Sequence, residues 1–263
     1  MAFPIILERG AVPGGFTIDP HVKVLDEWVV RRAKTRGLDA LVYAPHFTRL
    51  PTIQERASRF SDDELLVIPG REVFTGTWRN RKHVLAIGLS DPVPDFITLK
   101  GAMDAFDRQG AAVLVPHPDF LTVSLDVQDI ERFADRIHAI ETYNPKHLDR
   151  HNRRAEALRN RFGRPAFASS YAHLPGTVGE VWTSMTDVKA SESGIVDAFV
   201  DGVARQTGHA TGTSHQLRCL AEFGHLFVEN SWQKFDRVVL SGREATHPRH
   251  PAYEGRFDHV ACY

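Results

Sequence analysis

The sequence lacks most features of a secreted, membrane-spanning or polyanion-binding protein. It has two cysteines, Cys219 and Cys262, in 263 residues. Two distant cysteines make no disulfide framework, so a hydrophobic core must support the fold, and a reducing, cytoplasmic location is expected. No apolar run approaches the roughly 20 residues of a membrane span, and the opening MAFPIILERG does not have the pattern of a signal peptide. The formal net charge of −1 argues against a surface that binds polyanions over its whole extent.

The chain does have enough apolar residues for one large core, at 42% of the sequence. Short apolar segments such as LDALVYA (38–44) and AAVLVP (111–116) alternate with amphipathic segments such as LDEWVVRRAKTRG (25–37). This alternation predicts an α/β protein with a parallel sheet, and the number of repeats favours a barrel. The rhythm ends near residue 204. We therefore expect a barrel over residues 1–204 and a helical and irregular extension over 205–263 that packs on it.

A histidine or a glutamate stands at the end of most predicted strands. The residues are His21, His46, Glu72, His117, Glu141 and His173, whereas His83 lies at the start of its strand. In a parallel barrel the C-terminal ends of the strands meet at one rim. Imidazole and carboxylate are suitable ligands for zinc, iron and manganese. The pattern predicts one shared metal site.

Seven short motifs carry a resemblance to a known family. In chain order they are DPHVK (19–23), APHFT (44–48), PGREV (69–73), KHVLAIGL (82–89), VPHP (115–118), IETYN (140–144) and SSYAH (169–173). Over about residues 16–180 the chain resembles the PHP (polymerase and histidinol phosphatase) superfamily. The resemblance implies a distorted (β/α)7 TIM-like barrel with up to three divalent metals at its rim, and in many members hydrolysis of phosphate esters.

The resemblance also implies a set of metal ligands: His21, His46, Glu72, His83, His117 and His173, with Glu72 bridging. Three positions depart from the family pattern. Lys23 and Tyr171 stand where a histidine and an aspartate usually bind the same metal, and Pro45 replaces an aspartate before His46.

These departures affect the expected metals unequally. The metal expected at Glu72, His83 and His117 keeps its whole set. A second metal would use His46 and His173 with one further group, for which Asp26 is a weak candidate. We therefore expect one or two zinc, manganese or iron ions per chain.

The first functional interpretation is a metal-dependent phosphoesterase that acts on a phosphorylated small molecule or a nucleotide. Glu72 and Lys23 would be catalytic, and Arg49, Lys146 and Tyr171 would contact the substrate. Lys23 would either remain charged beside an anionic partner or become neutral.

Two other interpretations remain open. A degenerate barrel could serve as an RNA- or protein-binding subunit, with the arginines of residues 147–164 and of TWRNRKH (77–83) as the nucleic-acid surface. A metal-dependent barrel that hydrolyses a carbon–nitrogen bond is the third. The six histidines of the extension show no repeated ligand spacing and are interpreted as structural: His209, His215, His225, His247, His250 and His259.

Overall fold

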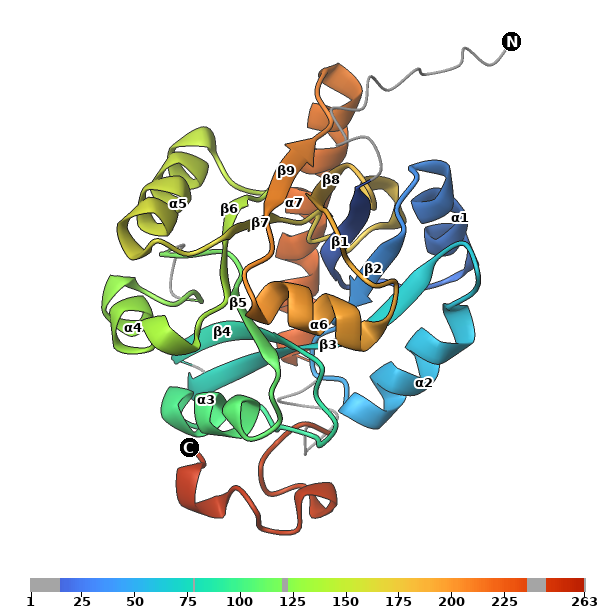
Figure 1. The fold of residues 1–263 in the computed structure, drawn as a ribbon. Helices are drawn as coiled ribbons and strands as arrows, with labels where there is room; N and C mark the ends of the chain where they lie inside the picture. The colour runs from blue at the N-terminus through green and yellow to red at the C-terminus, as the bar shows by residue number, and fades with distance from the viewer. Residues whose placement is uncertain (1–14, 78, 120–122, 236–244, 263) are drawn as a thin grey trace.

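The architecture comes from a computed structural model that describes residues 15–77, 79–119, 123–235 and 245–262. One twisted sheet curls into a nearly closed barrel, with helices on its outer side (Figure 1). The described strands are β1 (Phe16–Val22), β2 (Ala40–Tyr43), β3 (Leu66–Thr77), β4 (Asn80–Ile87), β5 (Ala112–Val115), β6 (Ala139–Tyr143), β7 (Ala166–Ala168), β8 (Val181–Met185) and β9 (Arg205–His209). Their order in the sheet is β7-β6-β5-β4-β3-β2-β1-β8-β9. The predicted α/β barrel of the distorted, TIM-like type is confirmed.

The sheet is not wholly parallel, in contrast to the expectation from the sequence. β3 and β4 form an antiparallel hairpin in which Phe74 pairs with His83, and β4 pairs with β5 antiparallel as well. Only two residues separate Thr77 from Asn80, which is too short for a parallel crossover. The segment REVFTG (71–76) belongs to the second half of the 12-residue strand β3. β8 is also antiparallel to both of its neighbours.

The barrel is closed where β7 faces β8. These two strands share no backbone ladder in the described sheet, and a side chain bridges them instead. The hydroxyl of Thr183 accepts from the backbone N–H of Ala168 at 3.0 Å and donates to its carbonyl at 2.9 Å. The inner face is filled by small and branched apolar residues, among them Val42, Ile68 and Leu114.

The helices begin and end at the signals that the sequence carries. They are α1 (Glu27–Thr35), α2 (Leu50–Phe60), α3 (Leu99–Asp107), α4 (Val127–Arg132), α5 (Asp149–Phe162), α6 (Glu192–Val200) and α7 (Thr213–Phe235). Asp26 caps α1 by accepting from the N–H of Val29 at 2.8 Å, and Asp126 and Asp129 form a capping box at α4. α5 ends at Gly163, whose φ of 61° suits a residue without Cβ. None of the described helices has both the length and the apolar character needed to cross a bilayer.

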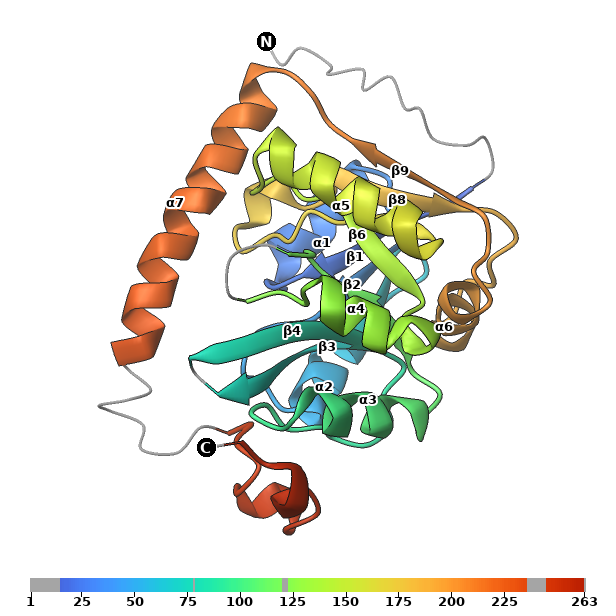
Figure 2. The same cartoon turned by 90° about the vertical axis from the view of Figure 1, so that its left-hand side faces the viewer.

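The region after residue 204 has two parts that lie on different sides of the barrel. β9 extends the sheet beside β8, and α7 then runs past one end of the barrel, at the left of Figure 2. Residues 245–262 pack near α3, where Tyr253 is fully buried and Ile97 bridges to Ala261. This second part contacts the buried ion pair of Arg71 and Asp95, whose Nη2 and Oδ2 atoms lie 3.0 Å apart, because the carbonyl of Thr246 accepts from the N–H of Asp95 at 2.9 Å. Residues 236–244 and 263 of the predicted extension lie outside the described residues.

Candidate metal centre

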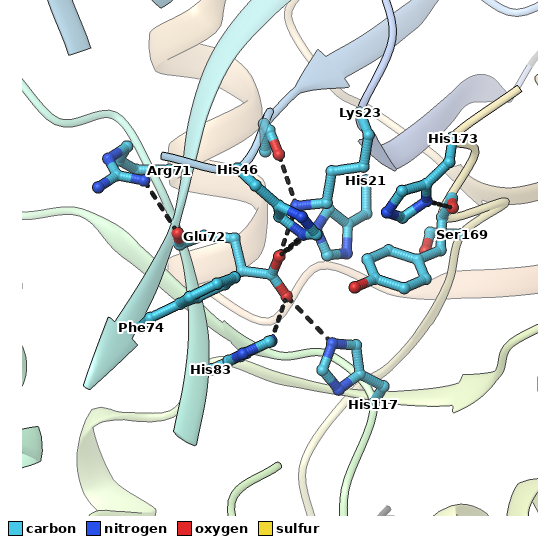
Figure 3. A network of polar contacts seen from close by, with 12 residues as sticks. His21, Lys23, His46, Arg71, Glu72, Phe74, His83, His117, Ser169 and His173 are labelled. Atoms are coloured by element: carbon cyan, nitrogen blue, oxygen red, sulfur yellow. Dashed lines mark hydrogen bonds and ion pairs between the residues drawn. The ribbon is translucent and has the colours of Figure 1, made fainter. Parts of the chain in front are cut away.

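One buried carboxylate, that of Glu72 on β3, lies at the centre of the histidines predicted from the sequence (Figure 3). Its Oε2 is 2.9 Å from Nε2 of His46 and 3.7 Å from Nε2 of His21. Its Oε1 is 3.0 Å from Nε2 of His117 and 3.2 Å from Nδ1 of His83. Side chains from β1, β4 and the loops after β2 and β5 therefore meet at a single residue.

The antiparallel hairpin accounts for the unusual position of His83. In the sequence this histidine precedes its strand, whereas the other candidates follow theirs. Because β4 runs opposite to β3, the first half of β4 lies at the same rim as the C-terminal half of β3. The ring of His83 stacks on Phe74, with 3.8 Å between the centroids and 3° between the planes.

The electrostatics of the site favour metal-binding protonation states. Burial lowers the pKa of His21 to about 3 and that of His83 to about 4, and it holds the pKa of His46 well below 6.5. These rings are therefore neutral at neutral pH, with nitrogen lone pairs free for a cation. Burial alone raises the pKa of Glu72, but nearby positive charge, that of Lys23 above all, lowers it well below its ordinary value.

Lys23 lies against the same carboxylate. Its Nζ donates to Oε2 of Glu72 at 2.5 Å and to the carbonyl of Ala44 at 2.6 Å, and its side chain is 4% exposed. Of the two states considered from the sequence, the structure contains the one in which Lys23 has an anionic partner. The ammonium group of Lys23 therefore contacts the same oxygen of Glu72 that lies 2.9 Å from Nε2 of His46.

The residues present fit a divalent metal. Both ring nitrogens of His21 and both of His83 are buried and lack a hydrogen bond of good geometry to any described residue. Buried polar atoms are rarely left in this state unless a ligand or an ion satisfies them. Within the described ranges, the donor atoms of Glu72, His83 and His117 lie within 4.8 Å of one another, which suits a shared ion.

His173, Lys146 and Tyr171 form a second layer beside this centre. The ring centroid of His173 is 5.3 Å from that of His46. Nζ of Lys146 lies 2.6 Å from Nδ1 of His173 and 4.3 Å from the centre of the Tyr171 ring. Nζ of Lys23 lies 5.4 Å from the centre of the same ring, so two ammonium groups lie near Tyr171.

Glu222 on α7 was missed by the sequence reasoning. Its fully buried carboxylate accepts from the backbone N–H of His173 at 3.1 Å and of Leu174 at 2.8 Å, and it also accepts from the hydroxyl of Thr177. Nζ of Lys146 lies 3.3 Å away. The extension therefore holds the loop that carries His173. A single glutamate in a helical segment gives no sequence signal for this role.

Several non-glycine residues of the rim, among them His117 and Tyr171, have left-handed backbones. The φ angles are 88° for His117 and 47° for Tyr171. Such a conformation costs a non-glycine residue on the order of 1 kcal/mol, and it is found mainly where surrounding structure imposes it, often at functional sites.

Glu141 and Asp19 are further buried carboxyls near the rim. Glu141 accepts from the hydroxyl of Ser169 at 2.6 Å and from the amide of Asn144 at 3.1 Å, and burial raises its pKa to about 7. Asp19 accepts from the N–H of Ser170 at 3.0 Å, and burial raises its pKa to about 6. Both fix loops that carry candidate ligands.

Other predicted residues lie away from the centre. Asp26 is exposed and engaged as the cap of α1, so its suggested role as a ligand is not supported by its position. Arg49 precedes α2 and acts electrostatically on Tyr253. Four arginines of the basic segment pair with acidic side chains: Arg154 with Asp119, Arg159 with Glu156, Arg161 with Glu131 and Arg164 with Asp135. These pairs reduce the positive field expected of a nucleic-acid surface.

Comparisons with known proteins agree with this geometry. Residues 149–204, which run from α5 to α6, match the family described as PHP-associated. The structure of PsfC from Pseudomonas syringae PB-5123 superposes with a TM-score of 0.61 and 19% identity, over 83% of this chain and 99% of PsfC. The structure of the lesion-specific endonuclease PfuEndoQ from Pyrococcus furiosus superposes with a TM-score of 0.50 and 15% identity. The superposition covers 73% of this chain and 57% of that protein. No curated protein matches the sequence. The match over residues 149–204 agrees with the predicted resemblance to the PHP superfamily for that part of the chain, and the superpositions agree with its fold.

Proposed function

We propose, on the premise that this chain has a PHP-type barrel, that it is a metal-dependent hydrolase of phosphate esters. The observation that carries the proposal is the convergence of four histidines on the buried carboxylate of Glu72. One or two divalent ions, zinc, manganese or iron, are the cofactors. A phosphorylated small molecule or a nucleotide is the substrate.

Each side chain has a distinct part in this proposal. Glu72, His83 and His117 hold one ion, and His46 and His173 contribute to a second, with His21 beside Glu72. A divalent ion in this position supplies Lewis-acid activation of a phosphate ester and of water. Before loading, the neutral imidazoles carry no charge and the Lys23 ammonium balances the ionised Glu72, so the nitrogen lone pairs of the imidazoles, and not a net negative charge, favour binding of a dication.

Lys23 takes over part of the charge that another metal would bring. Its ammonium is fixed 2.5 Å from Oε2 of Glu72. One fixed positive charge there limits the number of dications that the same carboxylate can share, which supports one or two ions rather than three. The same charge attracts the phosphate group of a substrate.

Lys146, Tyr171 and Arg81 form the substrate side of the proposed site. Lys146 donates to the carbonyl of Tyr171 and forms an ion pair with Glu222. It therefore holds the loop of Tyr171 in place, and its positive charge also attracts an anion. Arg81 lies on β4 two residues before His83, so the alternation of the strand brings its side chain to the same face of β4 as His83. A guanidinium binds phosphate oxygens through several N–H groups at once. Arg49 is the weaker candidate because it lies toward Tyr253.

The test is a hydrolysis screen with manganese, zinc or iron, using phosphomonoesters, nucleotides and short single-stranded DNA. Glu72→Gln is the test variant, and Glu64→Gln is its control because the Glu64 side chain is 77% exposed. We expect metal-dependent phosphate ester cleavage by the wild type and the control, and a loss of about 100-fold or more in Glu72→Gln. Failure of every substrate with a metal-loaded protein would favour a barrel retained for binding. Full activity in Glu72→Gln would contradict the site.

A further inference from the structure

The helix α7 turns its polar side toward the barrel. Nδ1 of His215 lies 2.7 Å from Oε2 of Glu180, which precedes β8, and Arg218 contacts the other oxygen of the same carboxylate. Glu222 is fully buried against the loop of His173. The three residues of α7 follow each other at spacings of three and four, so they form one face. A surface helix of a globular protein usually has the opposite arrangement, with its apolar stripe toward the core.

The apolar residues of α7 lie on its outer side. Leu217, Leu220 and Phe223 follow each other at three-residue intervals and are 63%, 67% and 55% exposed. Ala221 and Gly224 are exposed beside them, and a Cβ added at Gly224 would enter open space among the described residues. Figure 2 shows α7 as the outermost element on its side of the barrel, so these side chains point away from the core. We call these five residues the outer face of α7.

The chemistry of the outer face favours a protein as its partner. Over residues 213–224 the exposed residues are all uncharged: Thr213, Ser214, Gln216, Leu217, Leu220, Ala221, Phe223 and Gly224. A helix that lies on a membrane has Lys and Arg beside its apolar face, and a nucleic-acid surface also needs positive charge. The centre of a protein interface is instead poor in charged residues and rich in apolar and aromatic ones.

The outer face carries both projections and recesses, so it is complementary to itself. Leu217 and Leu220 project from the helix, whereas Ala221 and Gly224 leave its backbone accessible. When two such helices pack antiparallel about a two-fold axis between residues 220 and 221, Leu217 of one copy faces Gly224 of the second copy, and Leu220 faces Ala221. Large side chains then lie over small ones in both directions, as an isologous interface requires. The absence of exposed charge on this face means that the pairing brings no like charges together.

We propose that the outer face of α7 is the interface of a homodimer, in which α7 of one copy packs antiparallel on α7 of a second copy. The two helices overlap over residues 213–228, which is a length of about 24 Å at 1.5 Å per residue. One helix face from each copy gives an interface at the lower end of the range for specific complexes, below roughly 1,200 Å² in total. We therefore expect a Kd in the micromolar range. The proposal is independent of the proposed hydrolase activity.

The dimer would act on the metal centre through the same helix. Glu222, on the inner side of α7, accepts from the backbone N–H of His173 at 3.1 Å and from that of Leu174 at 2.8 Å. Burying the outer face against a second copy fixes α7 from outside, so it also fixes the carboxylate that holds this loop. Dimerisation should therefore restrict the motion of the loop that carries His173.

The experiment measures the mass of the full-length protein by sedimentation velocity from about 1 to 200 µM, which brackets a micromolar Kd. Leu220→Glu puts a carboxylate at the centre of the interface and should weaken dimerisation at least about tenfold. Val200→Glu is the matched control, because Val200 is 42% exposed at the end of α6, on the other side of the barrel in Figure 2. Wild type and control should dimerise alike. A wild type that stays monomeric throughout, which would leave a different protein as the partner, or a Leu220→Glu variant of wild-type affinity, would overturn the proposal.

A pair of substitutions tests the register of the two helices. Leu217→Glu and Gly224→Arg should each weaken the dimer about tenfold or more, because each puts an unpaired charge into the interface. Within one chain the two positions are about 10 Å apart along the helix, beyond the usual range of intrahelical ion pairs. In the proposed register, however, the two introduced charges meet across the two-fold axis, so the double variant should dimerise more tightly than either single variant. A double variant weaker than both would contradict the antiparallel pairing.

Discussion

Replacing Lys23 with methionine removes the ammonium group that faces Glu72 and keeps a side chain of similar length. The Nζ–Oε2 distance is 2.5 Å, and the two side chains are 4% and 0% exposed. Removing one partner of a buried ion pair costs roughly 3–5 kcal/mol because the remaining charge has no compensation. For a chain of this size that corresponds to a decrease in Tm on the order of 10 °C.

The assay is urea or thermal unfolding in the presence of a chelator, repeated after addition of zinc or manganese. Without metal, Lys23→Met should have an unfolding free energy roughly 3–5 kcal/mol below that of the wild type. Added metal should raise the unfolding free energy of the variant more than that of the wild type, because a dication replaces the missing charge. Lys34→Met is the matched control: this lysine lies 2.6 Å from Asp62, whose side chain is 48% exposed, and solvent screens such surface pairs so that they contribute little to stability. Equal stability of Lys23→Met and wild type in chelator would refute the reasoning.

Three further predictions concern other buried carboxyls and their partners. The pKa of His215 is raised to about 9 by Cys219 and Glu180, so its contribution is fully present below pH 6.5 and is lost as the pH rises through 9. Urea titrations should show that the free energy of unfolding decreases between these pH values by on the order of 1–2 kcal/mol, after allowance for solvent screening. This decrease should be absent in His215→Gln. Glu222→Gln should lower the unfolding free energy by about 1–3 kcal/mol and speed proteolysis within α7, and unchanged cleavage would show that the carboxylate does not fasten the helix. Burial raises the pKa of Glu141 to about 7, so the stability favoured by its neutral form is fully present below pH 4.5 and is lost as the pH rises through 7. Glu141→Gln should therefore be more stable than wild type at pH 8, and a less stable variant there would contradict this assignment.

The rim of the barrel could be predicted from the sequence because its signals are local. His46 and His117 follow short, fully buried apolar strands closely. A residue in that position lies at the rim formed by the C-terminal ends of the strands. The helix ends were readable for the same reason, since Asp26 and Gly163 act on neighbouring backbone groups.

Features that depend on distant partners could not be predicted. Glu222 accepts a hydrogen bond from His173, which is 49 residues away in the sequence, and the sequence near either residue contains no signal for this contact. β9 has the sequence RQTGH and is mostly exposed, so it lacks the apolar alternation of a strand and forms only because β8 offers a backbone ladder. The antiparallel direction of β4 could not be predicted from its apolar residues, because their pattern is the same for a parallel and an antiparallel strand. The short link after Thr77 is what requires the antiparallel arrangement.

The most direct test of the account is the metal content of protein purified without chelator. Elemental analysis of the wild type should find one or two zinc, manganese or iron ions per chain. Glu64→Gln should match it, while Glu72→Gln, which keeps the shape of the side chain but loses its charge, should retain clearly less. A folded wild type that carries no metal and cannot be loaded, or a Glu72→Gln variant with the full complement, would contradict a metal centre built around Glu72.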